Sequence, residues 1–185
     1  MAKIFLFRHG QTSDNKDKIF SGWRNVDLTP EGEKEAEKIA GKLRSETPTK
    51  AYASDLIRSQ HTLQIVLASH PPVPTVIDPR IKERDYGNLT GKSKTELEEK
   101  DPVHFQLWHR SYNTPPPGGE SIAMVEKRVI AFLQEMFNDM KQNDCIFISA
   151  HGNSIRPMRK HFEHLSNEEM CSYEYAPATV FSYTV

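Results

Sequence analysis

Short apolar runs alternate along this chain with stretches whose apolar residues recur at helical spacing, and this alternation limits the possible folds more than any other feature. Buried strands are predicted at Ile4–Phe7 and Cys145–Ile148, with shorter ones at Ala51–Ser54 and Val76–Ile77. Apolar and polar residues alternate over Thr179–Tyr183, which indicates a final strand.

Helices are predicted between these strands. Thr29 suits the N-cap and Pro30 the first helical position, so one helix begins there, and another is expected from about Leu56. Two later helices carry apolar stripes, made of Ile122, Val125, Val129, Phe132, Met136 and Met140, and of Ile155, Met158, Phe162 and Leu165. Strands and helices in this order predict an α/β fold, a mostly parallel open sheet with helices on both faces. The length of 185 residues is that of a single domain, residues 1–185.

The carboxyl ends of the predicted strands carry the residues with the most chemistry. In open parallel sheets, ligands bind at that edge. Arg8 and His9 follow the first strand, the stretch from Ser54 to Arg58 follows the second, and the stretch from His151 to Asn153 follows the central one. The fold therefore predicts that two arginines and two histidines meet at one rim.

These residue types suit phosphoryl transfer. A neutral histidine such as His9 is a nucleophile that can carry a phosphoryl group, and arginine presents a planar fork to phosphate oxygens. Arg8, Arg58 and a protonated His151 would supply the positive charge that this transfer needs. Arg58 is also expected in the first turn of its helix, where the helix dipole disfavours a cation unless an anion lies nearby. The alternative for Arg58 is a surface residue that pairs with Asp55.

Charge and composition exclude several classes of function. The formal net charge is −1, so no strong overall field attracts nucleic acid or an anionic membrane. No apolar run is long enough for a membrane span, and the N-terminus lacks a secretory signal, so a cytoplasmic protein is expected. The two cysteines, Cys145 and Cys171, are interpreted as structural thiols. The histidines lack partners at metal-ligand spacing, so no metal site is expected.

Several ordered motifs resemble the histidine phosphatase superfamily, and within it the cofactor-dependent phosphoglycerate mutases. The likeness extends over nearly the whole chain. The motifs are Arg8-His9-Gly10-Gln11-Thr12 with Asn15, Phe20-Ser21-Gly22-Trp23, Asp27-Leu28-Thr29-Pro30-Glu31-Gly32, Ser54-Asp55-Leu56-Ile57-Arg58, Glu83-Arg84-Asp85-Tyr86-Gly87 with Leu89-Thr90-Gly91 and Lys94, Trp108 with Arg110 and Tyr112, Pro115-Pro116-Pro117, Gly119-Glu120-Ser121, and Ala150-His151-Gly152-Asn153-Ser154.

The resemblance implies a role for each matching residue. His9 becomes phosphorylated, and Glu83 moves the proton of the substrate hydroxyl. Arg8, Arg58 and His151 hold the phosphoryl group, with help from Asn15 and the Gly152 amide. The residues implied to contact the substrate phosphate or carboxylate are Ser21, Gly22, Tyr86, Lys94, Arg110 and Asn153.

The activity implied is an isomerase that interconverts 2- and 3-phosphoglycerate, a step of glycolysis and gluconeogenesis. 2,3-Bisphosphoglycerate would prime His9 as the cofactor, with no metal. The partners are then small phosphorylated molecules, and a homodimer stays open. The fold implied is the three-layer sandwich of the phosphoglycerate mutases, with residues 80–120 as a lid or subdomain over the site.

Two departures from the mutase pattern keep an alternative open. His109 stands where mutases usually have the first of two arginines, and Pro117 is followed directly by Gly118-Gly119-Glu120-Ser121, where mutases have a longer segment. The sequence given also ends at Val185, without a tail after the last strand. Segments of this kind exclude water from an active site. A shorter cover would let water take the phosphoryl group, and the protein would then be a phosphomonoester phosphatase with the same phosphohistidine.

Overall fold

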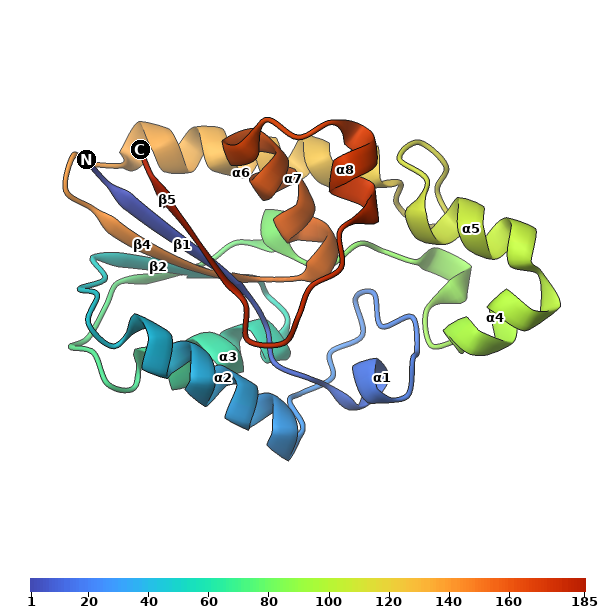
Figure 1. Ribbon diagram of the computed structural model, residues 1–185, viewed down its shortest axis with the longest axis horizontal. Helices are drawn as coiled ribbons and strands as arrows, with labels where there is room; N and C mark the ends of the chain where they lie inside the picture. Colours follow the sequence, from blue (N-terminus) through green and yellow to red (C-terminus); the bar gives the residue numbers. More distant parts are fainter.

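The computed structural model describes residues 1–185 and contains one five-stranded sheet (Figure 1). The strands are β1 (Lys3–Arg8), β2 (Lys50–Ala53), β3 (Thr75–Ile77), β4 (Cys145–Ala150) and β5 (Val180–Thr184). They lie in the order β3-β2-β4-β1-β5. Strands β3, β2, β4 and β1 are parallel to one another, and β5 is antiparallel to β1. The predicted mostly parallel sheet is confirmed.

Helices cover both faces of the sheet, as predicted. On one face lie α2 (Pro30–Leu43) and α3 (Ile57–Leu67), and on the other α6 (Ile122–Asp139) and α7 (Gly152–Glu163) (Figure 1). The period of two along β1 divides its side chains between the two cores. Ile4 and Leu6 pack in the core of α6 and α7, whereas Phe5 and Phe7 pack in the core of α2 and α3.

Smaller elements gather beyond the carboxyl ends of the parallel strands. They are α1 (Ser13–Lys16), two short 3₁₀ helices η1 (Pro79–Ile81) and η2 (Gly87–Leu89), α4 (Lys94–Lys100), α5 (Pro102–Arg110) and α8 (Asn167–Ser172). α4 and α5 extend away from the sheet in Figure 1. They share a small core, in which Phe20, Tyr86, Leu89 and Phe105 are buried.

The cap predicted for α2 is present, and similar signals begin α5 and α8, two helices that the sequence did not predict. The Thr29 hydroxyl accepts a hydrogen bond from the Gly32 amide at 3.1 Å, which caps α2. α5 begins in the same way, with Asp101 as the cap and Pro102 in the first turn. α8 begins with a capping box in Ser166 and Glu169. Helices α5 and α8 are short, so their stability depends on tertiary packing, and they are too short for a clear apolar periodicity in the sequence.

A close approach between two glycines fixes the loop that follows β1. A Cβ atom on Gly10 would lie 2.1 Å from the Gly32 carbonyl oxygen, and one on Gly32 would lie 2.1 Å from the Gln11 carbonyl oxygen. Only residues without a side chain fit at this distance. The start of α2 therefore sets the position of the loop directly after His9.

Both cysteines are free and buried, as expected of structural thiols. No helix combines the length and apolar character needed to cross a membrane.

Candidate active site

His9 lies at the end of β1 with only 5% of its surface exposed. Its Nδ1 atom is 2.7 Å from the Gly10 carbonyl oxygen. A carbonyl can only accept, so Nδ1 carries the proton and the lone pair of the neutral ring is on Nε2. Burial lowers the pKa of His9 well below 6.5, and the cations Arg58 and Arg8 lower it further. The ring is thus neutral at physiological pH, as a nucleophile must be.

Arg58 points at His9 from the first turn of α3. Its Nε atom donates to His9 Nε2 at 3.2 Å, and its terminal nitrogens donate to the carbonyls of Arg24 at 2.7 Å and Gly22 at 2.9 Å. Arg58 is 1% exposed, so the surface alternative considered for it is wrong. Asp55 pairs with Lys82 instead, at 3.5 Å.

His151 follows β4 and completes the predicted cluster. Its ring centre is 4.9 Å from that of His9, and its Nε2 lies 2.6 Å from the Ser54 hydroxyl at the end of β2. The expectation of a protonated His151 needs correction. Burial, Arg58, His9 and Arg8 lower its pKa well below 6.5, so the imidazole is neutral in this arrangement. An anion bound between the two arginines would offset the effect of their charges and favour protonation.

Glu83 is a buried carboxylate rather than a member of a solvated loop. One of its oxygens accepts from the Arg84 amide at 2.7 Å and from the Asn153 side-chain amide at 2.9 Å. Burial raises the pKa of Glu83, but these hydrogen bonds and the nearby Arg58 and Arg8 outweigh it, so the pKa lies below 4.5. The carboxylate is therefore ionised at neutral pH and ready to accept a proton.

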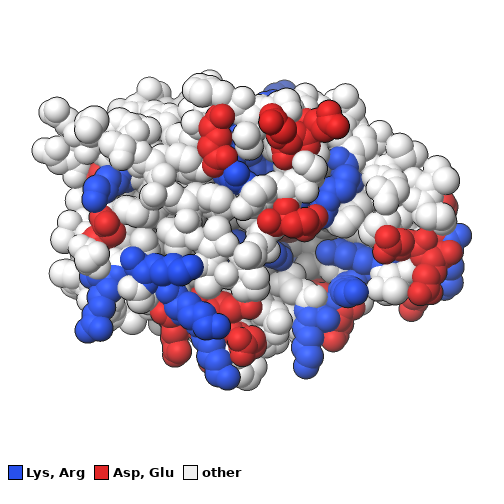
Figure 2. All heavy atoms as spheres, in the orientation of Figure 1, with Lys and Arg blue, Asp and Glu red and all other residues white.

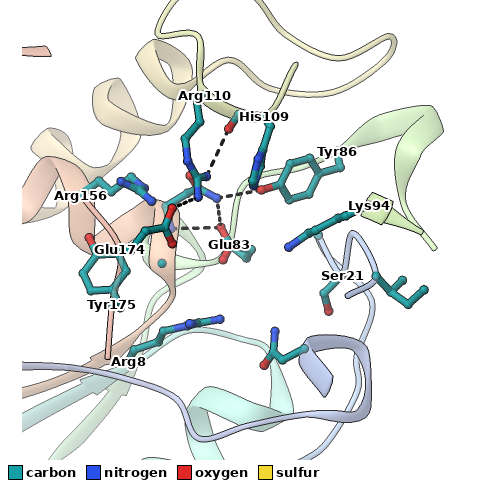
Figure 3. Close-up of a pocket in the computed structure, with 15 residues that line it drawn as sticks. Arg8, Ser21, Glu83, Tyr86, Lys94, His109, Arg110, Arg156, Glu174 and Tyr175 are labelled. Carbon is teal, nitrogen blue, oxygen red and sulfur yellow. Dashed lines mark hydrogen bonds and ion pairs between the residues drawn. The ribbon is translucent and has the colours of Figure 1, made fainter. Parts of the chain in front are cut away.

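A cavity of about 140 Å³ lies between Glu83 and the substrate residues expected from the sequence (Figure 3). It is lined by Arg8, Asn15, Ser21, Gly22, Glu83, Tyr86, Lys94, Arg110, Gly152 and Asn153. A second cavity, which shares Arg8 and Asn15 with the first, reaches His9. Arg58 and His151 lie behind His9 and contact its ring. The structure thus brings every sequence-predicted site residue to one place.

The cavity lining is rich in cations although the chain as a whole is nearly neutral. Arg8, Lys94, Arg110 and Arg156 line it, against the carboxylates of Glu83 and Glu174. Figure 2 shows basic side chains around a hollow beside α4 and α5, with acidic side chains close to them. No group of three or more metal-ligating side chains lies together in the chain. The positive charge of the cavity lining favours an anionic ligand.

Comparison with known proteins agrees with this geometry. A family model described as "Histidine phosphatase superfamily (branch 1)" matches residues 4–185. The chain belongs to the histidine phosphatase superfamily.

Curated relatives carry the name 2,3-bisphosphoglycerate-dependent phosphoglycerate mutase. The protein of that name from Nitrobacter winogradskyi is 38% identical over 179 residues, covering 94% of this chain and 86% of the relative. The one from Cytophaga hutchinsonii is also 38% identical, covering 95% of this chain and 84% of the relative.

Solved structures share the fold at lower identity. YhfR of Bacillus stearothermophilus superposes with a TM-score of 0.90 at 24% identity, covering 100% of this chain and 92% of that one. A putative alpha-ribazole-5'-P phosphatase of Escherichia coli gives a TM-score of 0.85 at 21% identity, covering 98% of this chain and 90% of that one.

In this member of the superfamily, residues that the sequence did not single out also line the cavity. They are Ile19, Arg156, Glu174 and Tyr175. Arg156 follows Asn153 by three positions on α7, so helical spacing from Asn153 could have identified it. Glu174 and Tyr175 precede β5. Because β5 is antiparallel, it is the beginning of this strand, not its end, that lies at the ligand-binding edge.

His109 lines the cavity at the position where the resemblance leads to an arginine. Burial and the cations Arg110 and Lys94 lower its pKa to about 3. Its ring packs against Phe105 and Phe20, with centres 4.8 and 6.1 Å apart. His109 thus supplies no positive charge at neutral pH.

Proposed function

We propose that this protein is a phosphoglycerate mutase that interconverts 2- and 3-phosphoglycerate through a phosphohistidine at His9. The observation that carries the proposal is one arrangement: the unprotonated Nε2 of His9 beside Arg58, with the ionised Glu83 in the adjoining cation-lined cavity. The curated relatives named as phosphoglycerate mutases support it, at 36 to 38% identity over most of the chain.

The cofactor implied by those names fits the residues of the cavity. Arg8 Nε and Ser21 Oγ are buried and have no hydrogen-bond partner. Lys94 and Arg110 add positive charge. These groups would hold a molecule with two phosphates and a carboxylate. 2,3-Bisphosphoglycerate would supply the phosphoryl group that primes His9.

Two transfers then involve residues of this chain. In one, Glu83 removes the proton of a glycerate hydroxyl, whose oxygen takes the phosphoryl group from His9 as the P–N bond breaks. In the other, His9 Nε2 forms the P–N bond with the second phosphoryl group, the bond between that phosphorus and its oxygen breaks, and Glu83 returns the proton it has taken to the leaving oxygen. Arg8 and Arg58 compensate the negative charge in both steps. Transfer to either of the two hydroxyls gives a net isomerisation.

Residues 80–120 serve in this proposal as the lid. They carry Glu83, Tyr86, Lys94 and Arg110 on one wall of the cavity. A mutase needs such a cover, because water that reaches the phosphohistidine converts it to free phosphate.

The proposal is tested by priming the purified protein with 2,3-bisphosphoglycerate and following both monophosphoglycerates. We expect interconversion without net release of phosphate. His9→Ala should lose both the activity and the acid-labile phosphate label. His61→Ala is the control, because the half-buried His61 pairs with Asp27 away from the cavities, and it should keep both. Label that survives in His9→Ala would contradict the assignment of the nucleophile.

A phosphomonoester phosphatase with the same phosphohistidine is the second candidate. The direct run from Pro117 to Gly118 and Gly119 favours it, because it leaves less chain to cover the site. Release of phosphate from the monophosphoglycerates without interconversion would decide for the phosphatase.

A further inference from the structure

Arg156 brings a guanidinium into the cavity without a carboxylate partner of its own. It is 4% exposed, and its Nη1 donates to the carbonyls of Met170 at 2.7 Å and Cys171 at 3.0 Å. Its Nε atom is buried with no hydrogen-bond partner. A buried cation without a counter-ion is costly, so this position favours an anion.

Tyr175 presents a second unsatisfied donor beside it. The ring centre of Tyr175 is 5.4 Å from the guanidinium carbon of Arg156. The Tyr175 hydroxyl is buried and has no hydrogen-bond partner, and the residue lines both the substrate cavity and the cavity that reaches His9. Figure 3 shows Arg110, Arg156 and Tyr175 around one end of the cavity, with Glu174 between them.

Glu174 places a carboxylate at this end of the cavity. It forms an ion pair with Arg110, and its side chain is 75% exposed against 27% for Arg110. Exposed ion pairs contribute little to stability, so this one is easily exchanged for another anion. A ligand anion that binds Arg110 has to displace Glu174.

We propose that Arg110, Arg156 and Tyr175 form a subsite for the anionic group of the substrate that is not transferred, and that Glu174 competes with the substrate for this subsite. The inference rests on the proposed function and extends it. It assigns roles to Arg156, Glu174 and Tyr175, which the sequence did not single out. His109, which also lines the cavity, is neutral. The two guanidinium groups of the subsite are therefore those of Arg110 and Arg156.

The subsite is tested by binding rather than by turnover. In a His9→Ala background, calorimetry measures the Kd of 2-phosphoglycolate, which carries a phosphate and a carboxylate, and of inorganic phosphate, which lacks the carboxylate. Glu174→Gln should lower the Kd of phosphoglycolate about three-fold, the size expected for the loss of one partly exposed ion pair. The Kd of inorganic phosphate should not change.

The matched control is Glu33→Gln, which removes the same charge from an exposed position on α2. It should leave both Kd values as they are. Equal tightening of both ligands by Glu174→Gln, or the same effect from Glu33→Gln, would reduce the result to overall charge and overturn the proposal.

Tyr175→Phe tests the subsite without disturbing the fold, because it removes only the hydroxyl. It should weaken phosphoglycolate about ten-fold, as expected for one hydrogen bond to a charged group, and leave phosphate unchanged. Arg156→Lys should have the same effect on both Kd values. Arg156 also donates to carbonyls at the carboxyl end of α8, so the folding of this variant is checked first. An unchanged Kd in Tyr175→Phe would overturn the subsite. Interconversion of phosphoglycerates by the His9-containing protein would still stand in that case, so the two proposals fail separately.

Discussion

Arg58 Nε donates a hydrogen bond to His9 Nε2, 3.2 Å away, at the nitrogen that we propose carries the phosphoryl group. The contact does two things. It occupies the lone pair of the nucleophile until the Arg58 N–H turns from the ring to the phosphoryl oxygens, and it disfavours protonation of the ring. Burial lowers the pKa of Arg58 itself to about 10, so Arg58 stays charged at neutral pH.

The first prediction follows from this contact. Burial, Arg58 and Arg8 hold the pKa of His9 well below 6.5, so His9 stays neutral as the pH falls below that value. Replacing Arg58 by Gln removes one of these causes, and the pKa of His9 should rise. The pH–rate profile for labelling of His9 should therefore lose activity at higher pH in Arg58→Gln than in the wild type, besides being slower throughout. The same phosphate donor is used for both proteins, so its own titration cancels. Superimposable profiles would contradict the prediction.

Glu83 should be separable from the nucleophile. Glu83→Gln cannot accept the proton of the substrate hydroxyl but leaves His9 intact. We expect it still to acquire the acid-labile label, although more slowly because Gln cannot protonate the leaving oxygen, and to turn over slowly. Quenched-flow measurement of label formation and decay checks this. Failure of Glu83→Gln to acquire any label would contradict the separation of Glu83 from the nucleophile.

Trp23 should affect catalysis through Glu83. Its indole nitrogen donates to the Glu83 backbone carbonyl at 2.7 Å, whereas the ring is 42% exposed. Trp23→Phe removes the donor and keeps an aromatic ring, so kcat should fall about five-fold, which corresponds to roughly 1 kcal/mol for one hydrogen bond, with little change in KM. Trp108→Phe is the matched control, since that ring stacks on His104 and should leave kcat unchanged. Equal losses in both variants would point to a general effect of tryptophan removal.

Two glycines of α2 should respond to alanine with opposite sign. At Gly41 an added Cβ has open space around it, so Gly41→Ala should stabilise the protein by about 0.5–1 kcal/mol. At Gly32 the Cβ would meet the Gln11 backbone at 2.1 Å, so Gly32→Ala should destabilise the protein and displace the loop after His9. Urea denaturation measures both effects, and labelling of His9 should fall only in Gly32→Ala. The same sign in both variants would mean that the close approach does not hold the loop.

The meeting of most residues of the candidate site could be predicted from the sequence, because one rule places them. Parallel strands end at a common edge, so Arg8, His9, Arg58 and His151 follow from the strand assignment alone. Glu83 could not be placed in this way, since it lies in a loop whose charged neighbours resemble a solvated surface. Its position depends on hydrogen bonds to Asn153 and Arg84 that link distant parts of the chain.

The rest of the site depends on chain direction and packing. Glu174 and Tyr175 lie at the ligand edge only because β5 is antiparallel, and the alternation over Thr179–Tyr183 does not reveal a strand's direction. The neutral state of His151 before an anion binds was not predicted either. The sequence shows that cations are near the imidazole, but not that burial and Arg58 lower its pKa.

Acid should destabilise the folded protein before its carboxylates titrate. The pKa values of His9 and His151 are held well below 6.5, mainly by burial, and that of His109 is lowered to about 3. In the unfolded chain each imidazole titrates near 6.5, so below that pH the unfolded state binds more protons than the folded state. The free energy of unfolding should therefore fall as the pH decreases from 7 to 5.5, by up to about 1.3 kcal/mol for each of these histidines. His109→Gln removes one of them, so urea denaturation at the two pH values should show a loss smaller by about that amount. An identical loss in the wild type and in His109→Gln would mean that His109 takes up a proton in the folded protein as it does in the unfolded chain. His109 would then add a positive charge to the cavity lining as the pH falls.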